Sequence, residues 1–152
     1  MADPFSILTS SVGLLDVLVR CGNCIKELID SAGRIEEEIR CLSNDLDALN
    51  SIRRSLEKLF NAEHGRSPDT PVADIWGHVG TLLKGCKATV EDVEGLVKEM
   101  IGKGGSAKAT GKLDGLKKAF RKASRDEDIK DLRLKLMDYQ SSLQVCLGAL
   151  NL

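Results

Sequence analysis

The feature that most constrains this chain is its N-terminal stretch, residues 1–29. Between Asp3 and Arg20, sixteen residues carry a single charge, that of Asp16. Asp3 followed by Pro4 is typical of a helix start, because Asp accepts bonds from free N–H groups and Pro has no N–H to lose. A helix built from this run is apolar on more than one face, so it must be buried in a helical bundle or in a membrane.

This first helix is intrinsically weak. Gly13 and Gly22 lie inside it, and each costs about 1 kcal/mol relative to Ala. The sequence indicates a segment too short and too charged for a ready-made membrane span, which needs about 20 apolar residues. The acidic start Met-Ala-Asp also argues against a secretory signal. We therefore expect the helix to lie inside a bundle at rest, with Leu14, Leu15 and Leu18 largely buried.

Composition is that of one ordinary domain spanning residues 1–152. Hydrophobic residues make up 42% and charged residues 30%, which is typical of a soluble protein with a sizeable core. Aromatic residues are only 3%, so Leu, Val and Ile must fill that core. The five cysteines are odd in number and form no disulfide framework, which predicts an intracellular protein with reduced thiols.

A second helix is predicted after a break at residues 30–33. Glu36-Glu37-Glu38 stands at its N-terminal end, where the helix dipole favours negative charge. Arg53 occupies one position of its apolar face, and we expect the neighbouring Ile52 to take its place in the core. The other positions of that face are Ile35, Ile39, Leu42, Leu46, Leu49, Leu56 and Phe60.

The third helix carries the most regular pattern in the chain. Thr70 and Pro71 predict its start. Its apolar positions alternate steps of four and three, which is typical of left-handed bundle packing. They are Val72, Trp76, Val79, Leu83, Cys86, Val90, Val93, Val97 and Met100.

The C-terminal third predicts a linker and two helices. Residues 102–111 are rich in Gly and Lys, which is typical of a flexible linker. A short basic helix follows, and a capping box of Ser124 and Glu127 predicts the start of a separate last helix. The apolar positions of these two helices are Leu113, Leu116, Phe120 and Ala123, then Ile129, Leu132, Leu136, Tyr139, Leu143, Cys146 and Leu150.

These patterns predict an all-α fold, a four- to five-helix up-and-down bundle with a hydrophobic N-terminal helix. We expect the first helix to pack against the second, third and last ones. The chain stops in mid-pattern at Leu152, which suggests the N-terminal module of a longer protein.

Catalytic and metal motifs are weak in this chain. Cys21-Gly-Asn-Cys24 has the spacing of a redox pair or half a zinc site, but it lacks the βαβ context and a second ligand pair, so we interpret it as a buried or partly buried helical pair. His64 and His78 have no metal spacing, and Gly105–Lys112 departs from the P-loop pattern. We predict no catalytic residues, no metal and no cofactor, and hence a protein that is not an enzyme. The acidic pairs are expected on solvated faces: Asp45 with Asp47, and Glu91 with Glu94.

Charge is concentrated in one segment. Residues 103–135 hold eleven of the 22 Lys and Arg. A solvated face is one interpretation. Nucleic acid is another, although only Phe120 is available for stacking and no known nucleic-acid motif is present. The third is an anionic lipid surface, which binds amphipathic helices with Lys and Arg on the polar face.

The order of the motifs resembles a known family. The start Met-Ala-Asp-Pro-Phe-Ser-Ile, with Ser-Ser-Val-Gly-Leu-Leu, is similar to that of HeLo-like domains, the N-terminal modules of fungal NLR-type (STAND) receptors and related cell-death effectors. Residues 82–86 and 90–96 resemble their middle helix, and residues 116–122 and 129–143 resemble their basic turn and final helix. Phe120 stands where the family often has Trp.

The resemblance implies a compact bundle, similar to the killer domain of the necroptotic mixed lineage kinase domain-like pseudokinase. It implies a cytoplasmic protein at rest that self-associates when an appended C-terminal region activates it, and then permeabilises the plasma membrane. The membrane-inserting helix would use Phe5, Ile7, Leu8, Val12, Leu14, Leu15 and Leu18. The contacts to anionic lipid head groups would come from Lys117, Lys118, Arg121, Lys122 and Arg125. The alternative is a non-lytic oligomerisation module that only passes a signal on, and in neither case is a specific nucleic acid a partner.

Overall fold

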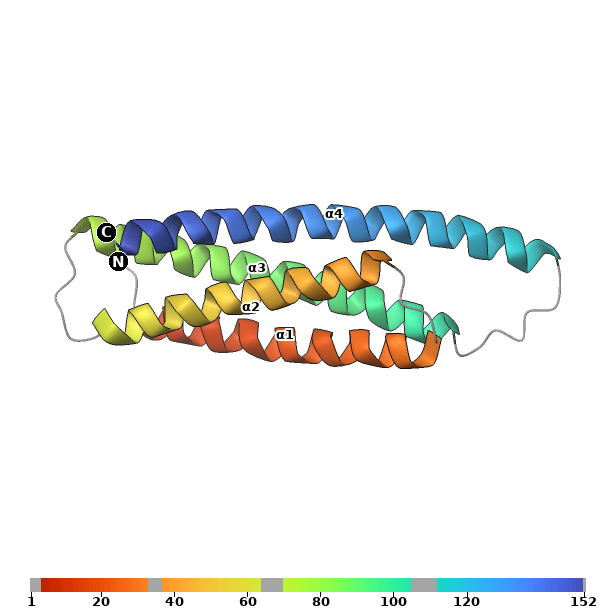
Figure 1. Ribbon diagram of the computed structural model, residues 1–152, viewed down its shortest axis with the longest axis horizontal. Helices are drawn as coiled ribbons and strands as arrows, with labels where there is room; N and C mark the ends of the chain where they lie inside the picture. Colours follow the sequence, from red (N-terminus) through yellow and green to blue (C-terminus); the bar gives the residue numbers. More distant parts are fainter. Residues whose placement is uncertain (1–3, 33–36, 64–69, 105–111, 152) are drawn as a thin grey trace.

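The computed structural model describes the backbone of residues 4–32, 37–63, 70–104 and 112–151, and the side chains of residues 7–30, 37–63, 71–101 and 126–151. These ranges form four helices: α1 (Pro4–Ala32), α2 (Glu37–Glu63), α3 (Thr70–Gly104) and α4 (Lys112–Leu150). The predicted all-α bundle with an apolar first helix is confirmed, and the helices run alternately up and down (Figure 1).

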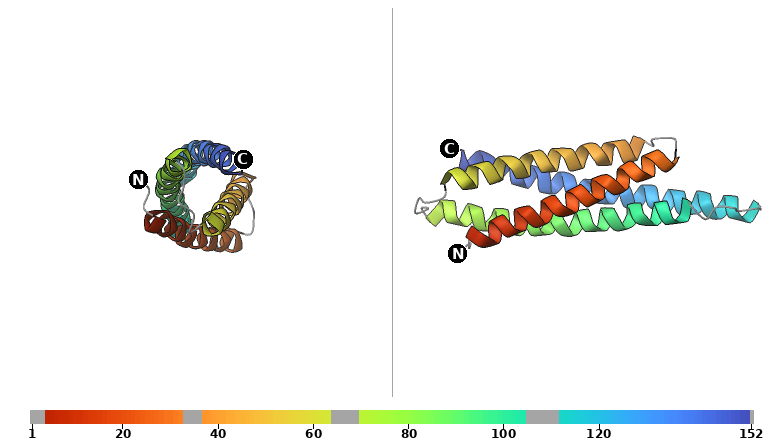
Figure 2. Two further views of the ribbon diagram at one scale, coloured as in Figure 1. Left: turned by 90° about the vertical axis from the view of Figure 1, so that its left-hand side faces the viewer. Right: turned by 90° about the horizontal axis from the view of Figure 1, so that it is seen from below.

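The ring order of the helices differs from their order in sequence. Seen end-on, the corners follow the order α1, α2, α4, α3 (Figure 2). α1 packs against α2 and α3, and α4 packs against the same two helices. The expectation that the first helix also packs against the last one is wrong, because α1 and α4 occupy opposite corners. A periodic pattern defines a buried face but does not select the neighbour that covers it.

The last helix is one continuous element. The predicted break at Ser124 is wrong, since α4 runs without interruption from Lys112 to Leu150. Between Leu116 and Leu147 the sequence has no Gly or Pro, so a single capping box is not enough to stop the helix. As a result, the N-terminal part of α4 extends beyond the ends of the other helices (Figure 1).

The predicted apolar faces form the core. In α3, the seven positions from Trp76 to Val97 are buried, and Val72 and Met100 are half-buried at the ends. In α4, Ile129, Leu136, Leu143 and Cys146 are buried. In α2 the apolar positions from Ile39 to Phe60 are buried, whereas Ile35 lies outside the described residues, as do the side chains of Leu113, Leu116, Phe120 and Ala123.

One end of the core is closed by an aromatic pair. Phe60 and Trp76 meet edge to face, with ring centroids 5.1 Å apart and planes at 79°. Trp76 donates a hydrogen bond from Nε1 to Oε2 of Glu63 at 3.1 Å, so its polar edge is satisfied. The pair joins α2 to α3 across the bundle, close to where α1 begins.

α4 is attached by one close approach and one cluster of ion pairs. Tyr139 packs over Gly85 of α3, and a Cβ at that position would lie 2.7 Å from its ring carbons. Arg133 binds Oδ2 of Asp45 at 2.8 Å and Oε2 of Glu38 at 3.1 Å, both on α2. Asp45 is therefore not the purely solvated carboxylate that its place in an acidic pair suggested.

Candidate functional site

The inner face of α1 is part of the core. Leu14 is 0% exposed and Leu18 is also buried, as predicted, whereas Leu15 is only half-buried. The residues that carry this face recur at helical spacing. They are Ile7, Leu14, Val17, Leu18, Cys21 and Ile25.

The outer face of α1 is also apolar. Val12 is 59% exposed and Val19 is 54% exposed; Leu8 and Leu15 beside them are half-buried, and Leu8 also packs against the core. We call these four residues the α1 outer stripe. The seven candidate inserting residues are thus divided: Ile7, Leu14 and Leu18 face inward, Leu8, Val12 and Leu15 belong to the outer stripe, and the side chain of Phe5 lies outside the described residues.

α1 has the length and composition of a membrane-spanning helix. The 24 residues Ile7–Asp30 meet both criteria, and no other helix does so within the described residues. The expectation that this stretch is too short and too charged is wrong on this point, because the apolar character continues through Cys21, Cys24 and Ile25 beyond Arg20. Core helices of soluble proteins meet the same criteria, so length alone does not assign a role.

A buried arginine connects α1 to α2. Arg53 is 3% exposed, although Ile52 beside it is buried as well, so Arg53 was not displaced from the core as expected. Its Nη1 donates to Oγ of Ser11 on α1 at 3.2 Å and pairs with Oε2 of Glu57, and its Nε donates to Oδ1 of Asn50 at 2.9 Å. Ser11 is itself buried and donates to the same Glu57 oxygen at 3.4 Å. Because a buried charge must be paired, this network fixes the register of α1 on α2.

A second polar contact connects α1 to α3. Nε of Arg20 lies 3.4 Å from Oε2 of Glu94, and the other oxygen of Glu94 accepts a bond from Lys98 at 3.2 Å. Glu94 is buried, so the expectation that it lies on a solvated face is wrong; Glu91, its partner in the acidic pair, is exposed. Little in the sequence indicated that Glu94 is buried, because Arg20 comes next to Glu94 only in the tertiary structure.

The thiols of the core are held in the neutral form. Burial raises the pKa of Cys21 to about 12 and that of Cys86 to about 12, and it also raises the pKa of Cys146. Cys21 is buried and Cys24 half-buried, as predicted for this pair. A thiol that stays protonated is a poor nucleophile, so the geometry does not support thiol chemistry at Cys21.

The predicted head-group residues lie in the N-terminal part of α4. The backbone of Lys117, Lys118, Arg121, Lys122 and Arg125 is helical, whereas their side chains lie outside the described residues. The structure therefore places them on a common helix and leaves their contacts open.

Comparison with known protein families finds a match over nearly the whole chain. Residues 2–152 match the family model described as "Pigment biosynthesis cluster protein PigL N-terminal". No curated protein and no solved structure matches the chain. The family match spans all four helices of the bundle.

Proposed function

The chain belongs to the PigL N-terminal family of pigment biosynthesis cluster proteins, and from this premise we propose that it is a HeLo-like, membrane-permeabilising cell-death domain. At rest the bundle is cytoplasmic and holds α1 inside. On activation by an upstream partner it self-associates, moves to the plasma membrane and inserts α1. The basic residues 117–125 bind anionic head groups at that stage, and no enzymatic step is involved.

The observation that carries the proposal is the double character of α1. It has the composition and length of a spanning helix, yet its inner face supplies six buried side chains to the core. Its outer face also exposes two apolar side chains, Val12 and Val19. Such a helix is suited to both environments.

The same burial explains why activation is needed. Six buried side chains, at about 1.5–3 kcal/mol each, make release of α1 cost on the order of 10 kcal/mol. Release would also leave Arg53 and Glu94 without their partners on α1, which adds to that cost. Spontaneous release is therefore rare, and lipid insertion or assembly must supply the compensating free energy.

One observation favours the alternative, a non-lytic oligomerisation module. Leu14 and Val17 are fully buried, so α1 is an integral helix of the core. In that case the bundle would self-associate and transmit a signal to another protein while α1 stays in the core. The membrane-permeabilising domain requires α1 to leave the bundle, whereas the non-lytic module does not.

A reversible disulfide tests that difference. The Cβ of a side chain at Gly80 would lie 3.7 Å from Cγ1 of Ile7, so the two positions face each other between α1 and α3, and a cysteine pair there is the cross-link to test. We expect the oxidised I7C/G80C variant to be inactive in a dye-leakage assay on anionic vesicles and to regain leakage when a reductant opens the bond. Wild type, with and without reductant, is the matched control, and mass spectrometry verifies the pairing.

Leakage by the oxidised variant at the wild-type rate would contradict release of α1. Absence of leakage from both the reduced variant and wild type, under conditions where the chain self-associates, would favour the non-lytic module. Vesicles of neutral lipid serve as a second control, because binding through residues 117–125 requires anionic head groups.

A further inference from the structure

Among the described residues, the exposed large apolar side chains lie on two helices. Within the described residues, five large apolar side chains are exposed: Val12 and Val19 on α1, and Leu134, Met137 and Val145 on α4. None lies on α2 or α3. Since α1 and α4 occupy opposite corners (Figure 2), the two apolar surfaces belong to opposite corners of the bundle.

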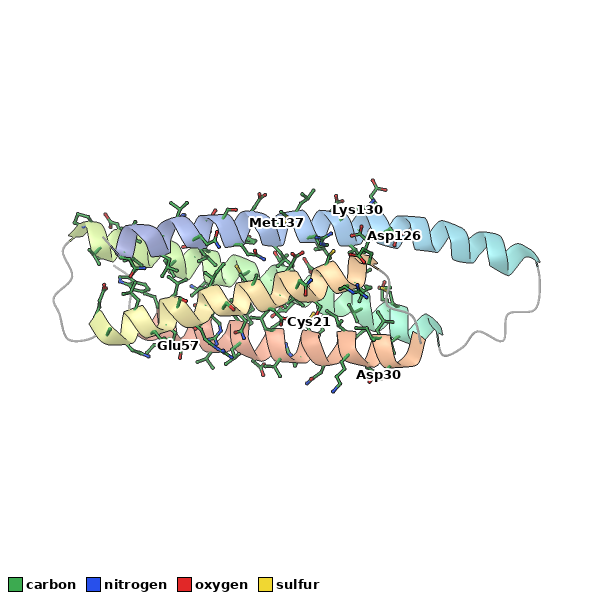
Figure 3. The ribbon with its side chains drawn as sticks, in the orientation of Figure 1. Cys21, Asp30, Glu57, Asp126, Lys130 and Met137 are labelled. Carbon is green, nitrogen blue, oxygen red and sulfur yellow. The ribbon has the colours of Figure 1, made fainter. Side chains whose placement is uncertain are left out.

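The surface on α4 has the spacing of a helix-packing seam. Leu134, Met137, Ser141 and Val145 follow at steps of three, four and four, and all four are exposed. We call them the α4 outer stripe; Figure 3 labels Met137 on this helix. The α1 outer stripe has steps of four, three and four. Both patterns match the spacing by which one helix packs against another.

The two stripes lie at the same height along the bundle. α3 is the common reference, because it packs against both helices. Gly13, near the middle of the α1 outer stripe, lies against Lys87, and Tyr139, near the middle of the α4 outer stripe, lies against Gly85. Both contacts fall on residues 85–87 of α3, so the two stripes flank the same part of that helix.

The directions of the helices are also compatible. α1 and α4 run antiparallel (Figure 1), so a copy shifted sideways along the α1–α4 diagonal, without rotation, brings its α4 stripe antiparallel onto the α1 stripe of its neighbour. The shared height needs no shift along the axis. The pairs that meet are Leu8 with Val145, Val12 with Ser141, Leu15 with Met137, and Val19 with Leu134.

Charge continues the match beyond the apolar pairs. At the same helical spacing the next positions are Gly22 and Lys26 on α1, and Lys130 and Glu127 on α4. In the antiparallel register, Lys26 lies opposite Glu127, and the exposed Gly22 leaves room for Lys130, which Figure 3 labels. A seam with apolar pairs and an opposite-charge pair at its end sets both partner and register.

We propose that the α1 outer stripe binds the α4 outer stripe of a second copy of this chain, giving a head-to-tail contact. Each copy carries one α1 outer stripe and one α4 outer stripe, so the contact is heterologous, and repeating the same shift without rotation extends it to an open row. This names the surface for the self-association in the proposed function and rests on that part of it. On α1 the contact involves the outer face and not the buried inner face. The contact therefore forms while α1 is still in the bundle.

The contact is a single helix pair, so it is weak in solution. A membrane surface strengthens it, because bound copies meet at a raised effective concentration. Association of the soluble protein should accordingly be seen only at the upper end of a concentration series.

The test is sedimentation velocity on wild type, V19E and L134E, without membranes. Wild type should form species of increasing mass, and each variant should lose at least tenfold in association constant. An equimolar mixture of V19E and L134E should recover association but stop at the dimer, because it pairs the intact α1 stripe of one with the intact α4 stripe of the other. Both substitutions are at exposed positions, and unchanged circular dichroism and urea unfolding verify the folds.

A charge exchange tests the register. K26E and E127K should each weaken association, and the double variant should restore it. Three outcomes would each overturn the proposal. Wild type could stay monomeric over the whole concentration series, the variants could associate like wild type, or the mixture of V19E and L134E could fail to form a dimer. The oxidised I7C/G80C variant should associate like wild type. If leakage fails, the association measured by sedimentation is unaffected. If association fails, the leakage assay still tests release of α1 independently.

Discussion

α1 and α4 are attached to the same two helices in different ways. α1 contributes six buried apolar side chains and places Ser11 against Arg53, which is 3% exposed. α4 contributes four buried apolar side chains, and its polar attachment is Arg133, which is about a quarter exposed and binds Asp45 and Glu38. Part of α4 also projects beyond the bundle (Figure 1). The difference teaches that the helix proposed to leave is the one held more firmly, so its release needs a trigger.

The largest expected effect separates the two faces of α1. Leu14→Ala should lower the free energy of unfolding by about 3–5 kcal/mol, because it opens a cavity at a position with no exposure. Val12→Ala, on the outer face, should change it by less than about 0.5 kcal/mol. Urea unfolding measures both. Equal losses would mean that the outer face is also packed.

The next largest expected effect is a difference in stability between the networks of Arg53 and Arg133. Glu57→Ala leaves the buried Arg53 without its carboxylate and should cost about 2–3 kcal/mol. Asp45→Ala should cost about 1 kcal/mol or less, since Arg133 remains hydrated and keeps Glu38. Salt sharpens the contrast: added sodium chloride should weaken the Asp45 contribution and leave that of Glu57 nearly unchanged.

The close approach of Tyr139 predicts a smaller effect at the α3–α4 contact. Gly85→Ala should cost about 1–2 kcal/mol, because the clash with the ring exceeds the gain of about 1 kcal/mol in helix propensity. Adding Tyr139→Leu should recover part of the loss, which a double-mutant cycle measures. A fully additive cycle would contradict the contact.

The smallest effect concerns pH. Burial raises the pKa of Cys21 and Cys86 to about 12 in the folded chain, whereas an unfolded thiol titrates near 9. The neutral thiols therefore contribute stability that is fully present below about pH 9 and is lost as pH rises toward 12. Urea midpoints at about pH 8 and pH 10 should differ less in Cys86→Ala than in wild type. An unchanged difference would show that other groups cause the alkaline loss.

Much of this molecule follows from periodicity in the sequence. The spacing from Trp76 to Val97 predicted the buried face of α3, and the apolar run after Pro4 predicted a helix with Leu14 and Leu18 in the core. These succeed because backbone hydrogen bonding and apolar burial act locally along one helix. The candidate site was predicted less well, because the candidate inserting residues of α1 were treated as one set, whereas the structure divides them between the core and the outer face.

Only the tertiary structure decided which residues meet. It placed α1 and α4 on opposite corners, joined the helices proposed around Ser124, and kept Arg53 in the core beside Ser11 and Glu57. It also buried Glu94 next to Arg20 and brought the two outer stripes to one height. The sequence determined which face of each helix is apolar, but the choice of neighbour depends on how four faces fit together at once, which no single helix encodes.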